Sequence, residues 1–258
     1  MRYQDFYDIG RDQPATASYA NPNLLKNRYG NIVAYDAGRV KLSQIGDDPS
    51  TDYINASWVD AYKQPNGYIA SQGPVPNSFL DFWRMVWEQN ACTIVMVTHE
   101  VEKGRIKCHR YWPDPTSTPP TQTLSYGDVT VTHLRAEAHR HFVVRTFLVR
   151  CNSEERTVKQ FAYTSWPDHG VPLTTAELLG FRNAVNAGTP NKDVPIVIHC
   201  SAGVGRTGTY IAIDTLVKQC LDMGGMPNVD AVVRDMRLRR NYMVQTEVCI
   251  GNVPNPDI

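Results

Sequence analysis

The sequence predicts a single α/β domain in which a central, highly twisted mixed sheet is flanked by helices. Two apolar runs, residues 92–98 and 194–199, are typical of buried strands, and helical patterns adjoin both of them. Three β-rich segments follow the first run in succession. The 258 residues can bury one sizeable core and contain no linker, so residues 1–258 are expected to form one domain.

The first half of the chain passes from loops to a helix and a strand. Residues 10–50 are rich in Asn, Pro, Gly and Asp and predict loops with short strands. A helix is predicted over residues 76–90, before the buried strand at 92–98 and a loop at 113–122. The apolar face of this helix consists of Phe79, Phe82, Trp83, Val86 and Trp87.

The middle of the chain predicts three neighbouring antiparallel strands. Residues 128–134, 141–151 and 156–164 are rich in Val, Thr and aromatic side chains. The polar residues between the second and third segments form a turn, which joins two strands that run in opposite directions.

The last third alternates helix and strand. A helix over residues 174–188 begins with a Thr–Glu capping box and ends at a glycine. The buried strand 194–199 follows, then a helix from about Arg206 to Gly225 and another over residues 229–242.

Charge and composition exclude several classes of protein. Lys plus Arg and Asp plus Glu number 26 each, so no basic excess favours nucleic acid, and the basic run 234–240 is expected to be a solvated helix face. No apolar run approaches the roughly 20 residues of a membrane span, and the acidic, aromatic N-terminus is unlike a secretory signal. Six irregularly spaced cysteines favour a reducing compartment, and no Cys or His spacing suggests a metal site.

The stretch IHCSAGVGRTGTY, residues 198–210, carries the chemistry. A strand ends before Cys200, and a helix begins near Arg206, so the loop between them can turn its N–H groups inward as an oxyanion cradle. Arg206 can close over the anion with a bidentate fork, and the same field stabilises a thiolate at Cys200. A buried cysteine alone is usually a small hydrophobic residue, but the combined pattern outweighs that reading. The loop residues expected to bind the anion are Ser201, Ala202, Gly203, Val204 and Gly205.

These motifs resemble the tyrosine-specific protein phosphatases. The likeness rests on HCSAGVGRTG and WPDHGVP, with NRYGN, DYINASWVDAY, YIASQGPVP, VEKGRIKCHRYWP and MVQTE, and it covers nearly the whole chain. Within the family, the chain looks most like the membrane-proximal catalytic domain of receptor-type members with MAM ectodomains. The resemblance implies hydrolysis of phosphotyrosine in proteins through a cysteinyl-phosphate intermediate, without a metal or organic cofactor. It also implies a cytoplasmic location, as a free enzyme or as the intracellular part of a single-pass membrane protein.

The resemblance assigns roles to further residues. Asp168 is the acid that protonates the leaving tyrosine oxygen, although an aspartate in such a turn can also merely cap its own backbone. Gln245 positions the water that hydrolyses the phosphocysteine. Tyr29 is the aromatic wall for the phosphotyrosine ring, and Asn31 stands where some members carry an aspartate that grips the substrate backbone. Thr207 is also catalytic, because its hydroxyl serves the Cys200 sulfur as that sulfur departs. Three residues are supporting: Glu102 pairs with Arg206, His199 orients the loop, and Trp166 is a loop hinge.

The chain departs from the family pattern after about residue 247. Cys249 stands in place of a second glutamine, and the glycine and prolines that follow do not allow the long closing helix of the family. The closing helix is therefore expected to be truncated or altered, which bears on the hydrolytic half-reaction. An alternative function is a catalytically impaired domain that binds phosphotyrosine or a partner, and a dual-specificity phosphatase is a third reading.

Overall fold

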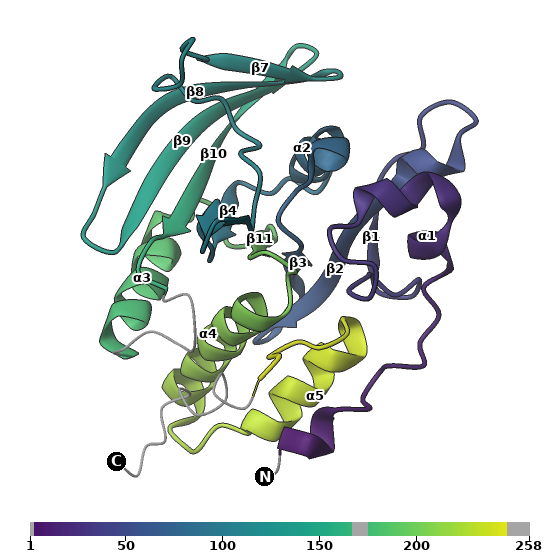
Figure 1. Ribbon diagram of the computed structural model, residues 1–258. Helices are drawn as coiled ribbons and strands as arrows, with labels where there is room; N and C mark the ends of the chain where they lie inside the picture. The colour runs from purple at the N-terminus through teal and green to yellow at the C-terminus, as the bar shows by residue number, and fades with distance from the viewer. Residues whose placement is uncertain (1–2, 167–174, 247–258) are drawn as a thin grey trace.

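The computed structural model describes residues 3–166 and 175–246, and these residues form a nine-stranded mixed sheet with helices on both faces (Figure 1). The strand order is β1-β2-β3-β11-β4-β10-β9-β8-β7. The strands are β1 (Arg39–Lys41), β2 (Tyr53–Ala61), β3 (Gln64–Ser71), β4 (Thr93–Met96), β7 (Thr123–Tyr126), β8 (Val129–Ala138), β9 (Phe142–Cys151), β10 (Glu154–Tyr163) and β11 (Ile196–His199). A separate two-stranded ribbon joins β5 (Val101–Glu102) to β6 (Arg105–Ile106).

Parallel pairing is confined to the centre of the sheet, where β3, β11, β4 and β10 lie side by side. The outer strands pair antiparallel through short turns, as the Val- and Thr-rich segments predict. The mixed α/β fold class is thereby confirmed. The central strand β11 is only four residues long and buried, and it delivers the chain directly to Cys200.

The sheet separates two core layers, and helices cover each of them. α3 (Thr175–Gly188), α4 (Gly205–Met223) and α5 (Val229–Arg239) pack on one face, and α2 (Phe79–Glu88) packs on the other (Figure 1). Apolar side chains at helical spacing on α2 form its buried stripe, as predicted. The remaining helical turns are α1 (Thr16–Tyr19), η1 (Tyr3–Phe6), η2 (Asn21–Lys26), η3 (Pro49–Asp52) and η4 (Pro76–Ser78).

Two features differ from the sequence expectations. The long hairpin of β2 and β3 was not predicted, because residues 53–61 are buried on both faces and so lack clear alternation. The basic run 234–240 is not the solvated face expected from it, since Arg237 is 1% and Arg240 0% exposed. Only part of that helix, including Arg234, faces solvent.

A buried ion cluster fixes α4 against the sheet and α3. The carboxylate of Asp214 on α4 accepts hydrogen bonds from Arg182 Nε at 2.7 Å and Asn186 Nδ2 at 2.9 Å, both on α3, and from the Tyr68 hydroxyl on β3. Lys218 Nζ lies 2.7 Å from the same carboxylate. Burial by itself raises the pKa of Asp214, but the charge of Lys218 and these hydrogen bonds outweigh it and hold the pKa below its usual value.

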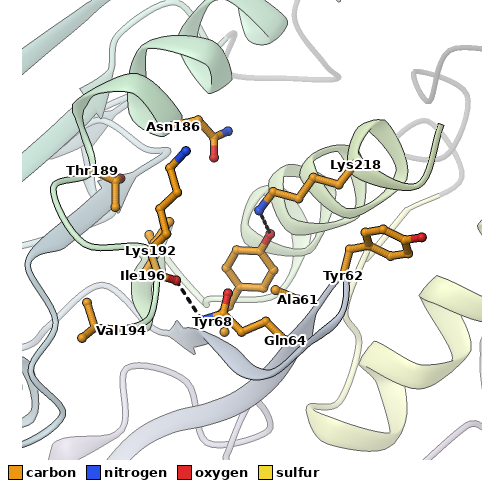
Figure 2. A pocket seen from close by; sticks show the side chains of 11 residues that line it. Ala61, Tyr62, Gln64, Tyr68, Asn186, Thr189, Lys192, Val194, Ile196 and Lys218 are labelled. Carbon is orange, nitrogen blue, oxygen red and sulfur yellow. Dashed lines mark hydrogen bonds between the residues drawn. The ribbon is translucent and has the colours of Figure 1, made fainter. Parts of the chain in front are cut away.

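A cavity of about 230 Å³ opens beside this cluster (Figure 2). Lys218 and Tyr68 reach toward each other at its wall, where Lys218 Nζ donates to the Tyr68 oxygen at 3.3 Å. Ile196, the first residue of β11, also lines the cavity. The cavity therefore lies at the opposite end of β11 from Cys200.

In the described part of the chain, no helix is both long and apolar enough to cross a membrane. The five cysteines described, Cys92, Cys108, Cys151, Cys200 and Cys220, are free thiols.

Candidate active site

The loop after β11 bends tightly around the Cys200 thiol. Cys200 is 5% exposed, and the backbone N–H of Gly203 lies 3.3 Å from its sulfur. Gly203 has φ +75°, and a Cβ there would stand 2.1 Å from the Ser71 carbonyl oxygen. Only glycine therefore fits this turn, which aims an N–H group at the thiol.

The carbonyl groups of this loop all point away from the sulfur. Each carbonyl oxygen from residue 200 to 203 accepts a hydrogen bond from a neighbouring element. The N–H groups of Ser201, Ala202 and Val204 have no hydrogen-bond partner among residues 3–166 and 175–246. A row of free N–H groups is what a tetrahedral oxyanion requires. The carbonyl bonds are Cys200 to His199 Nδ1 at 3.3 Å, Ser201 to Gly73 N at 2.9 Å, Ala202 to Arg240 Nη2 at 3.1 Å, and Gly203 to Arg240 Nε at 3.0 Å.

Arg240 and Arg237 are functional residues that the sequence analysis missed. Arg240 follows α5 and is fully buried, and burial lowers the pKa of its guanidinium to about 10. Arg237 donates to the carbonyl oxygens of Met243 at 2.9 Å and Val244 at 3.0 Å, on the segment that leads to Gln245. Helical spacing puts both positions on the face that carries the apolar residue Met236, which is buried, and this spacing was the sequence signal that the two arginines are buried.

Arg206 is held by a buried carboxylate. Its Nη1 and Nη2 lie 2.5 and 3.0 Å from the two oxygens of Glu102 on β5, and its Cζ lies 5.7 Å from the centre of the Trp166 ring. Burial works to raise the pKa of Glu102, but the hydrogen bonds and charge of Arg206 lower it below the usual range. This two-point contact fixes the orientation of the Arg206 guanidinium.

The structure places Tyr29 at the rim of the loop, and Asn31 follows it two residues later. The Tyr29 hydroxyl lies 2.9 Å from Ser201 Oγ, and its ring is 36% exposed. Asn31 is exposed, and its carbonyl oxygen accepts a hydrogen bond from Asn241 Nδ2 at 3.2 Å. An exposed ring beside the loop is a surface on which an aromatic group can stack.

Other expected site residues also lie around the start of α4. A Cβ at Gly205 would stand 3.3 Å from Gln245 Oε1, so the Gln245 side chain lies over the N-terminus of α4. The Thr207 hydroxyl is buried without a partner in the described chain and makes no hydrogen bond to the Cys200 sulfur; the Gly203 N–H faces that sulfur instead.

His199 and Trp166 occupy buried positions. His199 is 0% exposed; burial lowers its pKa to about 4, and its Nε2 lies 2.7 Å from the Tyr111 hydroxyl. Trp166 packs edge-on to Tyr163 at 6.2 Å. Asp168 and Cys249 lie outside the described residues.

A thiol ringed by free N–H groups, between a strand and a helix N-terminus and beside a fixed guanidinium, defines a cysteine-dependent phosphatase site. The model of the protein-tyrosine phosphatase family matches residues 23–249, which is most of the chain. The chain belongs to the protein-tyrosine phosphatase family.

Two receptor-type proteins are similar to the chain over 95% of its length. It is 46% identical over 252 residues to receptor-type tyrosine-protein phosphatase eta of Gallus gallus, and 45% identical over 250 residues to receptor-type tyrosine-protein phosphatase F of Danio rerio. The matches cover 17% and 13% of those proteins, so the chain spans only a small part of the relatives it matches.

Proposed function

We propose that this domain hydrolyses phosphotyrosine in proteins through a phosphocysteine formed on Cys200. The observation that carries the proposal is the outward binding of every carbonyl group from residue 200 to 203, which leaves N–H groups around the sulfur. The thiolate attacks phosphorus, while these N–H groups and Arg206 hold the phosphoryl oxygens.

The remaining steps use Asp168, Gln245 and Thr207. Asp168 protonates the tyrosine oxygen as the P–O bond breaks, which leaves neutral tyrosine and the phosphocysteine. Gln245, over the start of α4, places a water molecule, and Asp168 takes its proton as oxygen attacks phosphorus. The Cys200 thiolate and phosphate are then released, and the Thr207 hydroxyl, which is buried without a partner among the described residues, serves the departing sulfur.

Selectivity for phosphotyrosine comes from the depth at which the Cys200 thiol lies below the surface. The thiol is almost fully buried, and the exposed Tyr29 ring stands beside the loop through its contact with Ser201. An aryl phosphate reaches the sulfur and stacks on the ring, whereas the shorter phosphoserine does not. Asn31, two residues after Tyr29 and exposed, hydrogen-bonds the substrate backbone in this proposal.

The parent protein is proposed to be a single-pass receptor that carries this domain in the cytoplasm, where its substrates are phosphotyrosine proteins. The receptor-type names of both relatives support this proposal. The likeness to members with MAM ectodomains stays a prediction.

The test compares initial rates on a phosphotyrosyl peptide and its phosphoseryl twin for wild type, Cys200→Ser and Asp168→Ala. The expected result is turnover of the first peptide only, abolished in Cys200→Ser and strongly slowed in Asp168→Ala. A stable phosphoenzyme with little turnover would place a defect at the Gln245 step. If the folded wild type binds the phosphotyrosyl peptide without hydrolysing it, the proposal is refuted in favour of a catalytically impaired domain that binds phosphotyrosine.

A further inference from the structure

A chain of hydrogen bonds runs from a surface cavity to the catalytic loop. It begins at Arg145 on β9, passes through Gln160 on β10 and Tyr111, and ends at His199 on β11. The three inner side chains are each 0% exposed. The distances are 2.9 Å from Arg145 Nη1 to Gln160 Oε1, 2.8 Å from Gln160 Nε2 to the Tyr111 oxygen, 2.7 Å from that oxygen to His199 Nε2, and 3.3 Å from His199 Nδ1 to the Cys200 carbonyl oxygen.

The two ends of this chain give it one direction. A guanidinium only donates hydrogen bonds, so the Gln160 oxygen must face Arg145 and its NH₂ group must donate to Tyr111. The Tyr111 oxygen accepts that bond, and within the described residues its own hydrogen has no acceptor other than His199 Nε2. His199 is neutral, so its hydrogen lies on Nδ1 and is donated to the Cys200 carbonyl.

Reversal of the hydrogen-bond direction between Arg145 and His199 would disturb the phosphoryl site. If the Gln160 amide turned over, Tyr111 would donate to it and accept from His199 Nε2. A bare Nδ1 would then face the Cys200 carbonyl oxygen, and two acceptors would repel each other. The carbonyl would lose the bond that holds it away from the free N–H groups of the loop.

We propose that Arg145 and Gln160 are positioning residues that hold His199 in its Nδ1–H form and thereby keep the Cys200 carbonyl oxygen turned away from the phosphoryl site. Neither side chain touches the loop directly. The inference deepens the proposed phosphatase function and rests on it for its kinetic consequences alone. The position of the His199 hydrogen is a property of the resting protein.

The first experiment is ¹⁵N NMR of the His199 ring in wild type, Gln160→Glu and Arg145→Lys. A carboxylate at position 160 accepts from both Arg145 and Tyr111, so in Gln160→Glu the chain reverses and His199 Nε2 gains a hydrogen. Lysine only donates, and the cavity of about 180 Å³ beside Arg145 leaves room for it, so Arg145→Lys keeps the wild-type pattern. A hydrogen on Nε2 in wild type, or a bare Nε2 in Gln160→Glu, would overturn the proposal.

The second experiment measures p-nitrophenyl phosphate turnover and the pH dependence of Cys200 alkylation by iodoacetate. Gln160→Glu and Arg145→Met should lower kcat/KM by about tenfold or more and shift the alkylation profile to higher pH. The matched control is Arg150→Met, an exposed arginine on the same strand that pairs with Glu155. Thermal unfolding verifies that each variant is folded. If Arg145→Met does not fold, Gln160→Glu tests the proposal by itself, because its carboxylate keeps the contact with Arg145.

The two experiments separate the two proposals. A reversed His199 with unchanged kcat/KM and alkylation would refute the positioning role. A wild type that shows Nδ1–H but hydrolyses no phosphotyrosine would refute the function and leave the hydrogen-bond direction standing.

Discussion

Arg240 donates from Nε to the carbonyl oxygen of Gly203 at 3.0 Å, across 37 residues of sequence. The same guanidinium binds the Ala202 carbonyl at 3.1 Å. A buried cation beyond the end of one helix therefore sets the peptide orientation of the loop that begins another. The free N–H groups around Cys200 are a consequence of this contact, because each peptide turns its N–H opposite to its C=O.

Replacement of Arg240 should lower catalytic efficiency strongly, although this arginine lies beyond the end of α5 and outside the cysteine loop. Arg240→Met releases two loop carbonyls, so kcat/KM for p-nitrophenyl phosphate is expected to fall about 100-fold, with a similar loss in orthovanadate affinity. The control is Arg239→Met, since Arg239 is a neighbouring, partly exposed arginine that pairs with Asp60. Equal behaviour of the two folded variants would refute the role of Arg240.

Glu102→Gln tests the tether of Arg206. The variant keeps the size of the side chain but sets an NH₂ group against one guanidinium nitrogen, so kcat/KM should fall about tenfold. Glu100→Gln is a matched control, because Glu100 makes the same two-point contact with Arg110 at the surface. Steady-state kinetics of both variants measure the effect, and a loss of the same size in Glu100→Gln would contradict it.

Asp214→Asn tests the cluster that fixes α4. It leaves the partly buried cations of Arg182 and Lys218 without their carboxylate, so the free energy of unfolding should drop by about 3 kcal/mol. Urea denaturation measures it. Asp222→Asn, which breaks the exposed pair with Lys63, should leave the midpoint almost unchanged. A stable Asp214→Asn variant would show that the cluster contributes little.

The neutral His199 predicts a stability that falls on mild acidification. Its pKa is about 4 in the folded protein and 6.5 ordinarily, so between these values the unfolded chain binds a proton that the folded one does not. The free energy of unfolding should therefore drop on the order of 3 kcal/mol from this residue as the pH falls from 6.5 to 4. Glu102 and Asp214, whose pKa values are lowered, stay charged in most of this window and lose their contributions only at lower pH. Denaturation of His199→Gln across this range should show a flatter slope, and an unchanged slope would contradict the assignment.

Hydrogen peroxide should inactivate the protein, and a thiol should restore it. A thiolate in the cradle of N–H groups is oxidised to sulfenic acid, which thiols reduce. Mass spectrometry should locate the early oxidation on Cys200 rather than on the exposed Cys220. Activity that is indifferent to peroxide would count against a thiolate at this position.

The class of fold, the main helices and the chemistry of the cysteine loop could be predicted from the amino-acid sequence. These are local matters: the apolar stripe of α2 repeats at helical spacing, and Gly203 permits a backbone turn that other residues do not. Hydrophobic patterning was less informative for β2 and β3, because strands buried on both faces carry no alternation.

The polar side chains that hydrogen-bond the cysteine loop could be identified only from the packing of segments that are distant in sequence. Helical spacing puts Arg240 on the face of α5 that carries Met236, but it does not show what that face packs against, so the contacts of Arg240 depend on how α5 packs against the rest of the domain. The line of hydrogen bonds from Arg145 to His199 likewise depends on strand order, since β10 and β11 are separated by β4 in the sheet and Tyr111 comes from a segment far from both in sequence. Hydrogen bonds between distant segments follow from packing and register, which a local pattern does not encode.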